Sequence, residues 1–66
     1  MTRIDGLSLA EAEHAIEDAH PGWQVGHSPG GWEYATRGTV TLWAPSVERI
    51  EEPIAVWEHA HPGVIA

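Results

Sequence analysis

The hydrophobic residues of this chain change their spacing twice, and this change constrains the fold more than any other feature. Apolar residues recur at helical intervals before His20 and again after Pro45, whereas they alternate with polar residues in between. Intervals of three or four residues mark one stripe of a helix, and alternation marks a strand with one buried face. A chain of 66 residues has room for a single domain with a thin core. The sequence therefore predicts a small α+β domain of order α-β-β-β-α, spanning 1–66.

The first predicted helix covers residues 8–20. Ser8 and Glu11 have the spacing of a capping box, in which each side chain bonds the backbone amide of the other residue. Pro21 disfavours helical geometry in the residue before it, and Gly22 supplies a permissive backbone, so the helix should end at His20. Its apolar stripe comprises Leu9, Ala12, Ile16 and Ala19.

Three strands are predicted at residues 23–27, 32–37 and 39–44. Glycine-rich turns separate them, and Pro45 ends the third. We expect His27 to pair with Trp32 and Thr36 with Val40, because this register gathers the apolar residues on one face of an antiparallel meander. A two-residue second loop would leave both faces half apolar, which disfavours it. The expected inner face contains Trp23, Val25, Trp32, Tyr34, Val40, Leu42 and Ala44. The expected outer face contains Gln24, Glu33, Ala35, Arg37, Thr41 and Trp43.

A second predicted helix covers residues 46–61, with Ser46 as its N-cap. Pro53 lies inside it and must either kink the helix or divide it into a short turn and a new helix. The apolar stripe continues in phase through Pro53, which favours the kink. Both helices should pack on the inner face of the sheet, which Leu9, Ile16, Ile50, Ile54 and Trp57 would cover.

Three segments carry a resemblance to a known group of proteins. They are Pro21-Gly22-Trp23, the segment Gly31-Trp32-Glu33-Tyr34-Ala35-Thr36-Arg37, and Ala44-Pro45-Ser46. Here the chain resembles small uncharacterised proteins of actinobacteria and their phages, over about residues 8–57. That resemblance implies the same element order and a bacteriophage or actinobacterial origin. It implies no activity, because the group has none assigned.

Several kinds of chemistry find no support in the sequence. Cysteine is absent, which removes disulfides, thiolate nucleophiles and thiolate metal ligands. No two of the 5 histidines have the four-residue spacing common in helical metal sites. These are His14, His20, His27, His59 and His61. No nucleophile motif or phosphate-binding loop is present, so we expect no enzyme activity, no cofactor and no metal.

The charge balance limits the partners. Ten carboxylates face three arginines, for a net charge of −7, whereas nucleic acids and anionic membranes attract clustered lysine or arginine. The first 20 residues contain no long apolar run of the kind that signal peptides and membrane spans require. We therefore expect a cytoplasmic protein that binds neither nucleic acid nor membrane directly, and whose partners carry a basic surface.

Two features suggest where such a partner would bind. Like charges lie four residues apart at Glu13 and Glu17 and again at Glu48 and Glu52, where they repel one another without basic counterparts. Asp18 adds to the first pair. Trp43 is expected on the outer sheet face, where it either anchors an interface, as exposed tryptophan often does, or packs against the aliphatic stem of Arg37 or a terminal segment.

Three interpretations of these features remain open. The acidic surface keeps the protein soluble, or it docks on a basic surface of a host protein in a regulatory role, imitation of the DNA phosphate array being one form of this. Alternatively, copies of the chain form a structural homo-oligomer that buries Trp43 and the outer sheet face.

Overall fold

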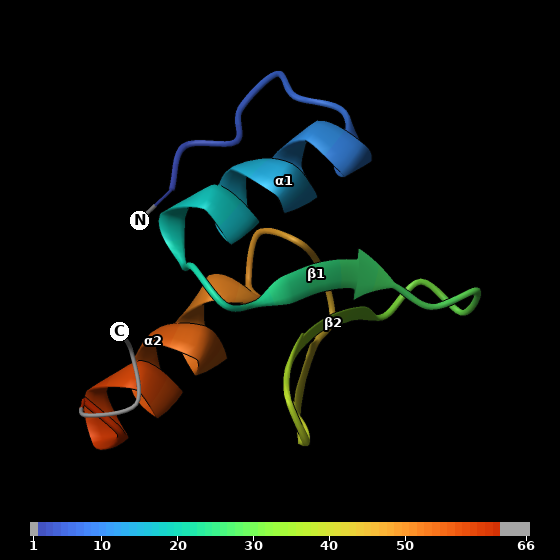
Figure 1. The fold of residues 1–66 in the computed structure, drawn as a ribbon. Coiled ribbons are helices and arrows are strands. Elements are labelled where there is room, and N and C mark those ends of the chain that lie inside the picture. The colour runs from blue at the N-terminus through green and yellow to red at the C-terminus, as the bar shows by residue number, and fades with distance from the viewer. Residues whose placement is uncertain (1, 63–66) are drawn as a thin grey trace.

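A computed structural model describes residues 2–62 of the chain, and Figure 1 shows its arrangement. The elements are α1 (Leu9–Ala19), β1 (Gln24–His27), β2 (Glu33–Arg37), β3 (Val40–Ala44) and α2 (Glu51–Ala60). The strands form one antiparallel sheet in the order β1-β2-β3. The predicted α+β fold class and the order α-β-β-β-α are confirmed. In this part of the chain no helix is long and apolar enough to cross a membrane.

The predicted capping box starts α1. The Glu11 amide donates to Ser8 Oγ over 3.2 Å, and the Ser8 amide donates to Glu11 Oε1 over 2.9 Å. At the other end the His20 amide donates to the Ile16 carbonyl, and Gly22 has a φ of +96° that allows the chain to turn into β1. Local signals thus set both ends of this helix.

The observed register of β2 differs by one residue from the predicted register on both of its sides. His27 pairs with Glu33, and Arg37 pairs with Val40. The predicted pairs, His27 with Trp32 and Thr36 with Val40, are wrong. Gly38, at a φ of +58°, takes a left-handed conformation that closes a two-residue loop, which tight hairpins commonly require.

The shifted register reverses β2 while β1 and β3 keep their predicted faces. Glu33 and Ala35 point inward and are only 2% and 0% exposed. Tyr34 lies on the outer face, and Trp32 is exposed. The predicted core positions of Trp32 and Tyr34, and the predicted outer positions of Glu33 and Ala35, are therefore wrong. The predicted register of β2 rested on gathering the aromatic residues on one face. It is wrong because the turns, and not the types of side chain, set the register.

The core lies between the sheet and the two helices. Its buried members are Ile16, Trp23, Val25, Ala35, Ala44, Ile50 and Ile54. Trp57 of α2 packs its ring edge-to-face on Trp23, with centroids 5.4 Å apart. Leu9 was expected to cover the sheet, but it is exposed in the first turn of α1 at the rim of a surface pocket.

The second helix starts later than predicted. Residues 45–50 form turns, in which the Arg49 amide donates to the Ser46 carbonyl, and α2 begins after Ile50 without a side-chain cap. The predicted N-cap at Ser46 and the continuous kinked helix from residue 46 are wrong, and the divided alternative is closer. Pro53 is the third residue of α2, where a missing N–H leaves no intrahelical bond unmade.

Candidate functional site

Two of the predicted partner-binding carboxylates are engaged within the fold. Glu13 is buried, and its Oε2 lies 2.9 Å from His27 Nδ1. Glu17 Oε2 accepts a 2.7 Å hydrogen bond from the Val25 amide, and its Oε1 lies 3.0 Å from His14 Nδ1. The expectation that these carboxylates lack partners is wrong, because His14, His27 and the Val25 amide supply them.

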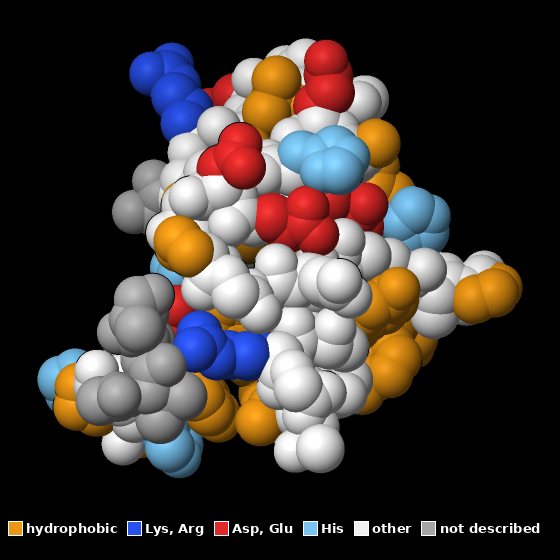
Figure 2. Space-filling model, viewed as in Figure 1, with side chains coloured by type: hydrophobic (Ala, Val, Ile, Leu, Met, Phe, Trp, Pro, Cys, Tyr) orange, Lys and Arg blue, Asp and Glu red, His pale blue; other side chains and the backbone are white. Residues whose placement is uncertain are grey.

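The other predicted carboxylates remain on the surface. Asp18, Glu48 and Glu52 are exposed, and none of their carboxylates forms a hydrogen bond or ion pair with another residue between 2 and 62. Figure 2 shows acidic side chains gathered over α1 in this view. Four ion pairs in the described part of the chain join a glutamate to a histidine. The exposed carboxylates of Asp18, Glu48 and Glu52 are thus available to solvent in the described part of the chain.

The outer side of the sheet carries exposed aromatic rings. Trp43 was predicted to lie outside the core, and it is 55% exposed there. Its ring contacts that of Tyr34 across the strands, with centroids 5.7 Å apart and planes at 60°. Trp32, two residues before Tyr34, is 54% exposed. We call Trp32, Tyr34 and Trp43 the outer aromatic face.

Gly26 of β1 leaves room for the Tyr34 ring, which lies directly against it. A Cβ on Gly26 would be only 2.6 Å from Tyr34 Oη and 2.8 Å from its Cζ. The strand residues of this side carry no charge, since they are Gln24, Gly26, Tyr34, Thr36, Thr41 and Trp43. The surface is therefore neutral and aromatic within a strongly acidic protein.

Gly26→Ala is expected to displace the Tyr34 ring and to destabilise the fold by about 1–3 kcal/mol, the usual range for overpacking. Thermal unfolding measures this loss, and tryptophan fluorescence reports the changed environment of Trp43. Gly30→Ala is the matched control, since its Cβ would meet only Ser28 Oγ at 3.9 Å. Equal losses in the two variants would contradict a close contact between Tyr34 and Gly26.

A second group of functional side chains lies on the inner side, where α1 meets the sheet. Glu13 of α1, His27 of β1 and Glu33 of β2 each present one potential ligand atom, and these atoms all lie within 4.8 Å of one another. Glu33 is 2% exposed, and its Oε2 has no hydrogen-bond partner. Burial, together with the Glu13 and Glu48 carboxylates, raises the pKa of Glu33 to about 8. When no cation is bound beside it, the Glu33 carboxyl is therefore mostly protonated at neutral pH.

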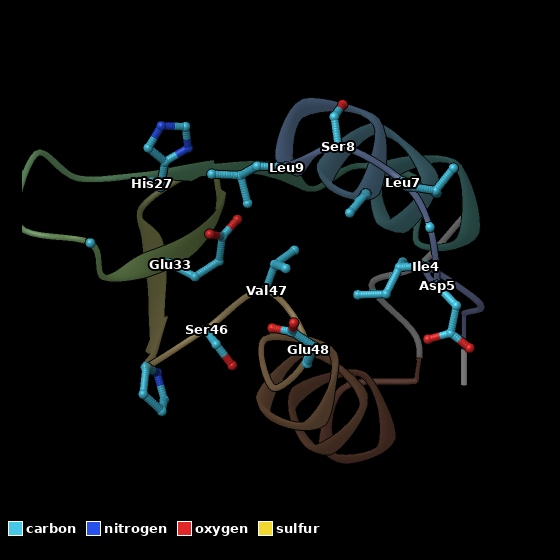
Figure 3. A pocket seen from close by; sticks show the side chains of 14 residues that line it. Ile4, Asp5, Leu7, Ser8, Leu9, His27, Glu33, Ser46, Val47 and Glu48 are labelled. Carbon is cyan, nitrogen blue, oxygen red and sulfur yellow. The ribbon is translucent and has the colours of Figure 1, made fainter.

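This inner cluster borders a surface pocket. The pocket has a volume of about 520 Å³ and runs between the first turn of α1 and the turns before α2. Figure 3 shows the Glu33 carboxylate pointing toward the space between Leu9 and Val47. Glu48 lines the same pocket. A small ion therefore has a route from solvent to the cluster.

A third polar group joins the end of α1 to α2. His20 places Nε2 2.8 Å from Glu51 Oε2 and Nδ1 2.9 Å from Glu58 Oε1. Glu51 also accepts bonds from the Thr2 amide and hydroxyl, and Glu58 accepts one from Trp23 Nε1. With a carboxylate at each ring nitrogen, both nitrogens donate, so the imidazole is charged.

The pKa values of this group follow from its geometry. Burial acts to lower the pKa of His20, but the bonds and charges of Glu51 and Glu58 outweigh it and raise the pKa. Burial acts to raise the pKa of Glu51, but the bonds from Thr2 and His20 outweigh it and lower the pKa. The group is therefore a structural ion cluster that holds the two helices together.

Sequence reasoning missed both histidine clusters. Their members come from different elements, at separations of 14 residues for Glu13 and His27 and 31 for His20 and Glu51. The spacing of histidines along one helix gives no sign of either cluster, and the predicted register placed Glu33 on the outer face. Only the register and the packing of α1 bring these side chains together.

Comparison with models of protein families, with curated proteins and with solved structures found no match to this chain.

Proposed function

We propose that this protein is a non-catalytic binding module that docks on a basic protein through its outer aromatic face. The observation that carries the proposal is the exposed Trp43, which packs edge-on against Tyr34 on a sheet face that neither helix covers. Tryptophan and tyrosine are enriched among the residues that dominate binding energy. An exposed aromatic group of this kind is uncommon in a small protein unless a partner covers it.

Charge argues for a basic partner. The chain has a net charge of −7, and Asp18, Glu48 and Glu52 carry exposed carboxylates without internal partners in the described part of the chain. Complementary charge speeds encounter and excludes wrong partners, while the neutral aromatic face supplies contact area. A regulatory protein that acts on a host protein in the cytoplasm fits this combination of exposed charge and a neutral contact face.

Self-association through the same face is the competing possibility. Two copies would bring two charges of −7 together, which opposes a homo-oligomer at low salt. A basic partner meets no such repulsion. The protein alone should therefore scatter light as a 7.2 kDa monomer.

Photo-crosslinking tests the proposal. A benzoylphenylalanine replaces Thr41, which is exposed on the outer face, or His14, which is exposed on α1 as a control. In an actinobacterial lysate, the probe at position 41 should give one discrete adduct with a basic protein. Trp43→Ala and high salt should each reduce its yield at least about tenfold, as expected for a hot-spot residue and a charge-steered contact.

Three results would contradict the proposal. One is equal adducts from positions 41 and 14, and another is an adduct that Trp43→Ala leaves unchanged. The third is an adduct of twice 7.2 kDa, which would show that the face binds a second copy.

A further inference from the structure

The inner cluster has the donors of a metal site. Glu13, His27 and Glu33 contribute two carboxylate oxygens and one imidazole nitrogen, all within 4.8 Å of one another. Ligand atoms around a tetrahedral Zn²⁺ lie roughly 3.3 Å apart, given bond lengths of about 2.0–2.2 Å. The Glu13 oxygen and the His27 nitrogen, at 2.9 Å, are already this close. The half-exposed His27 ring has freedom to adjust.

A second observation, independent of the ligand distances, points to a cation in this cluster. Glu33 is 2% exposed, and its Oε2 has no hydrogen-bond partner. A buried polar atom without a partner is costly, and native structures rarely contain one. A proton shared between Glu13 and Glu33 satisfies only one oxygen of Glu33, and Oε2 stays unpaired. A cation bound between the Glu13 and Glu33 carboxylates would remove the repulsion between their charges. It would also bind Glu33 in its ionised form, so no shared proton would be needed.

We infer that Glu13, His27 and Glu33 bind a divalent transition-metal ion, and that Zn²⁺ fits the site best. Zinc accepts histidine nitrogen together with carboxylate oxygen, and it commonly takes three protein ligands and one further ligand. Mg²⁺ and Ca²⁺ prefer six or more oxygen ligands and would leave the imidazole unused. The pocket in Figure 3 gives access for water, or for the nearby Glu48, as the fourth ligand.

Such an ion would join three elements of a small domain. Its ligands come from α1, β1 and β2. Domains of this size bury little surface and often use metals or disulfides for stability, and this chain has no cysteine. Zn²⁺ should therefore stabilise the fold. The inference reverses the expectation from histidine spacing, and it does not depend on the outer aromatic face.

Metal titration of the chelator-stripped full chain tests the inference. Calorimetry with Zn²⁺ should show one site, and Co²⁺ in place of Zn²⁺ should give the visible absorption of four-coordinate cobalt. At free Zn²⁺ about a hundredfold above Kd, the melting temperature should rise by on the order of 10 °C. Glu33→Gln and His27→Gln should each weaken binding at least about tenfold.

Matched controls separate this site from adventitious binding. His59→Gln and Glu52→Gln alter exposed residues of α2 outside the cluster and should leave Kd unchanged. His27 is half exposed, so His27→Gln should keep the far-ultraviolet circular dichroism of the parent protein. Loss of binding in that folded variant supports the site. No binding at all, or equal weakening by His27→Gln and His59→Gln, would overturn the inference.

Discussion

Replacing His20 by alanine is expected to destabilise the fold by about 3–5 kcal/mol, because it leaves the Glu51 and Glu58 carboxylates without their shared cation. All three side chains are largely buried, at 11–17% side-chain exposure. Removing one member of a buried ion cluster leaves the charges of the other members buried and uncompensated. Because small domains have only about 0.05–0.15 kcal/mol of stability per residue, this loss is large enough to unfold much of the protein.

Urea denaturation followed by tryptophan fluorescence measures this loss. His59→Ala is the control, since His59 is exposed near the end of the same helix that carries Glu51 and Glu58. Its effect should stay within about 0.5 kcal/mol. A His20→Ala variant as stable as His59→Ala would show that the cluster contributes little.

The same cluster predicts how stability depends on pH. The folded state raises the pKa of His20 above 6.5, so its contribution is complete below about pH 6.5 and is lost as the pH rises through the folded pKa. The lowered pKa of Glu51 acts oppositely: its contribution is complete above 4.5 and is lost on acidification. The cluster therefore contributes most between these two values. Glu51, Glu58 and the neighbouring Glu52 are the charged groups of α2 that face His20.

The difference in unfolding free energy between the parent protein and His20→Gln isolates this contribution. Measured in the presence of a chelator, that difference should shrink between pH 5.5 and pH 8.5. A difference that stays constant or grows over this range would contradict a charged His20 in the folded state.

Replacing Ile54 by alanine should destabilise the fold by about 2–5 kcal/mol. Ile54 is fully buried on α2 and belongs to the core between the sheet and the helices. Truncation removes apolar contacts and leaves a cavity that a thin core cannot close. The melting temperature should fall by more than roughly 10 °C, at 4–8 °C for each kcal/mol in a domain of this size.

Val56→Ala provides the matched control on the same helix. Val56 is 71% exposed, and alanine has the higher helix propensity, so the variant should be as stable as the parent or slightly more so. Similar losses in the two variants would show that α2 does not pack through its Ile54 side.

Local signals explain which parts of the fold the sequence could predict. The capping box at Ser8 and the Pro21-Gly22 stop act within a few residues, so α1 could be read directly. The register of β2 could not, because it depends on whether the glycines at 31 and 38 adopt positive φ. One residue of shift at each turn exchanged Glu33 and Ala35 with Trp32 and Tyr34. The aromatic residues favoured the wrong face, since burial of tryptophan is only a tendency.

The candidate sites divide in the same way. Trp43 was predicted to lie outside the core, and the structure confirms its exposure. This prediction succeeded because β3 keeps its predicted face. The cluster of Glu13, His27 and Glu33 depends on tertiary packing and on the reversed strand, so no spacing in the sequence indicates it. Glu13 and Glu17 look unpaired in sequence, but residues 14 and 27 and the Val25 amide bind them in space.

The orientation of β2 is the structural fact on which both proposals depend, and a nuclear Overhauser spectrum of the full chain tests it most directly. The observed register predicts contacts from the Tyr34 ring to the Trp43 ring and to the Gly26 α protons, with the Ala35 methyl in the core. Contacts from the Tyr34 ring to Ile16 and Ile54 instead would contradict it. They would place the aromatic face inside and Glu33 in solvent.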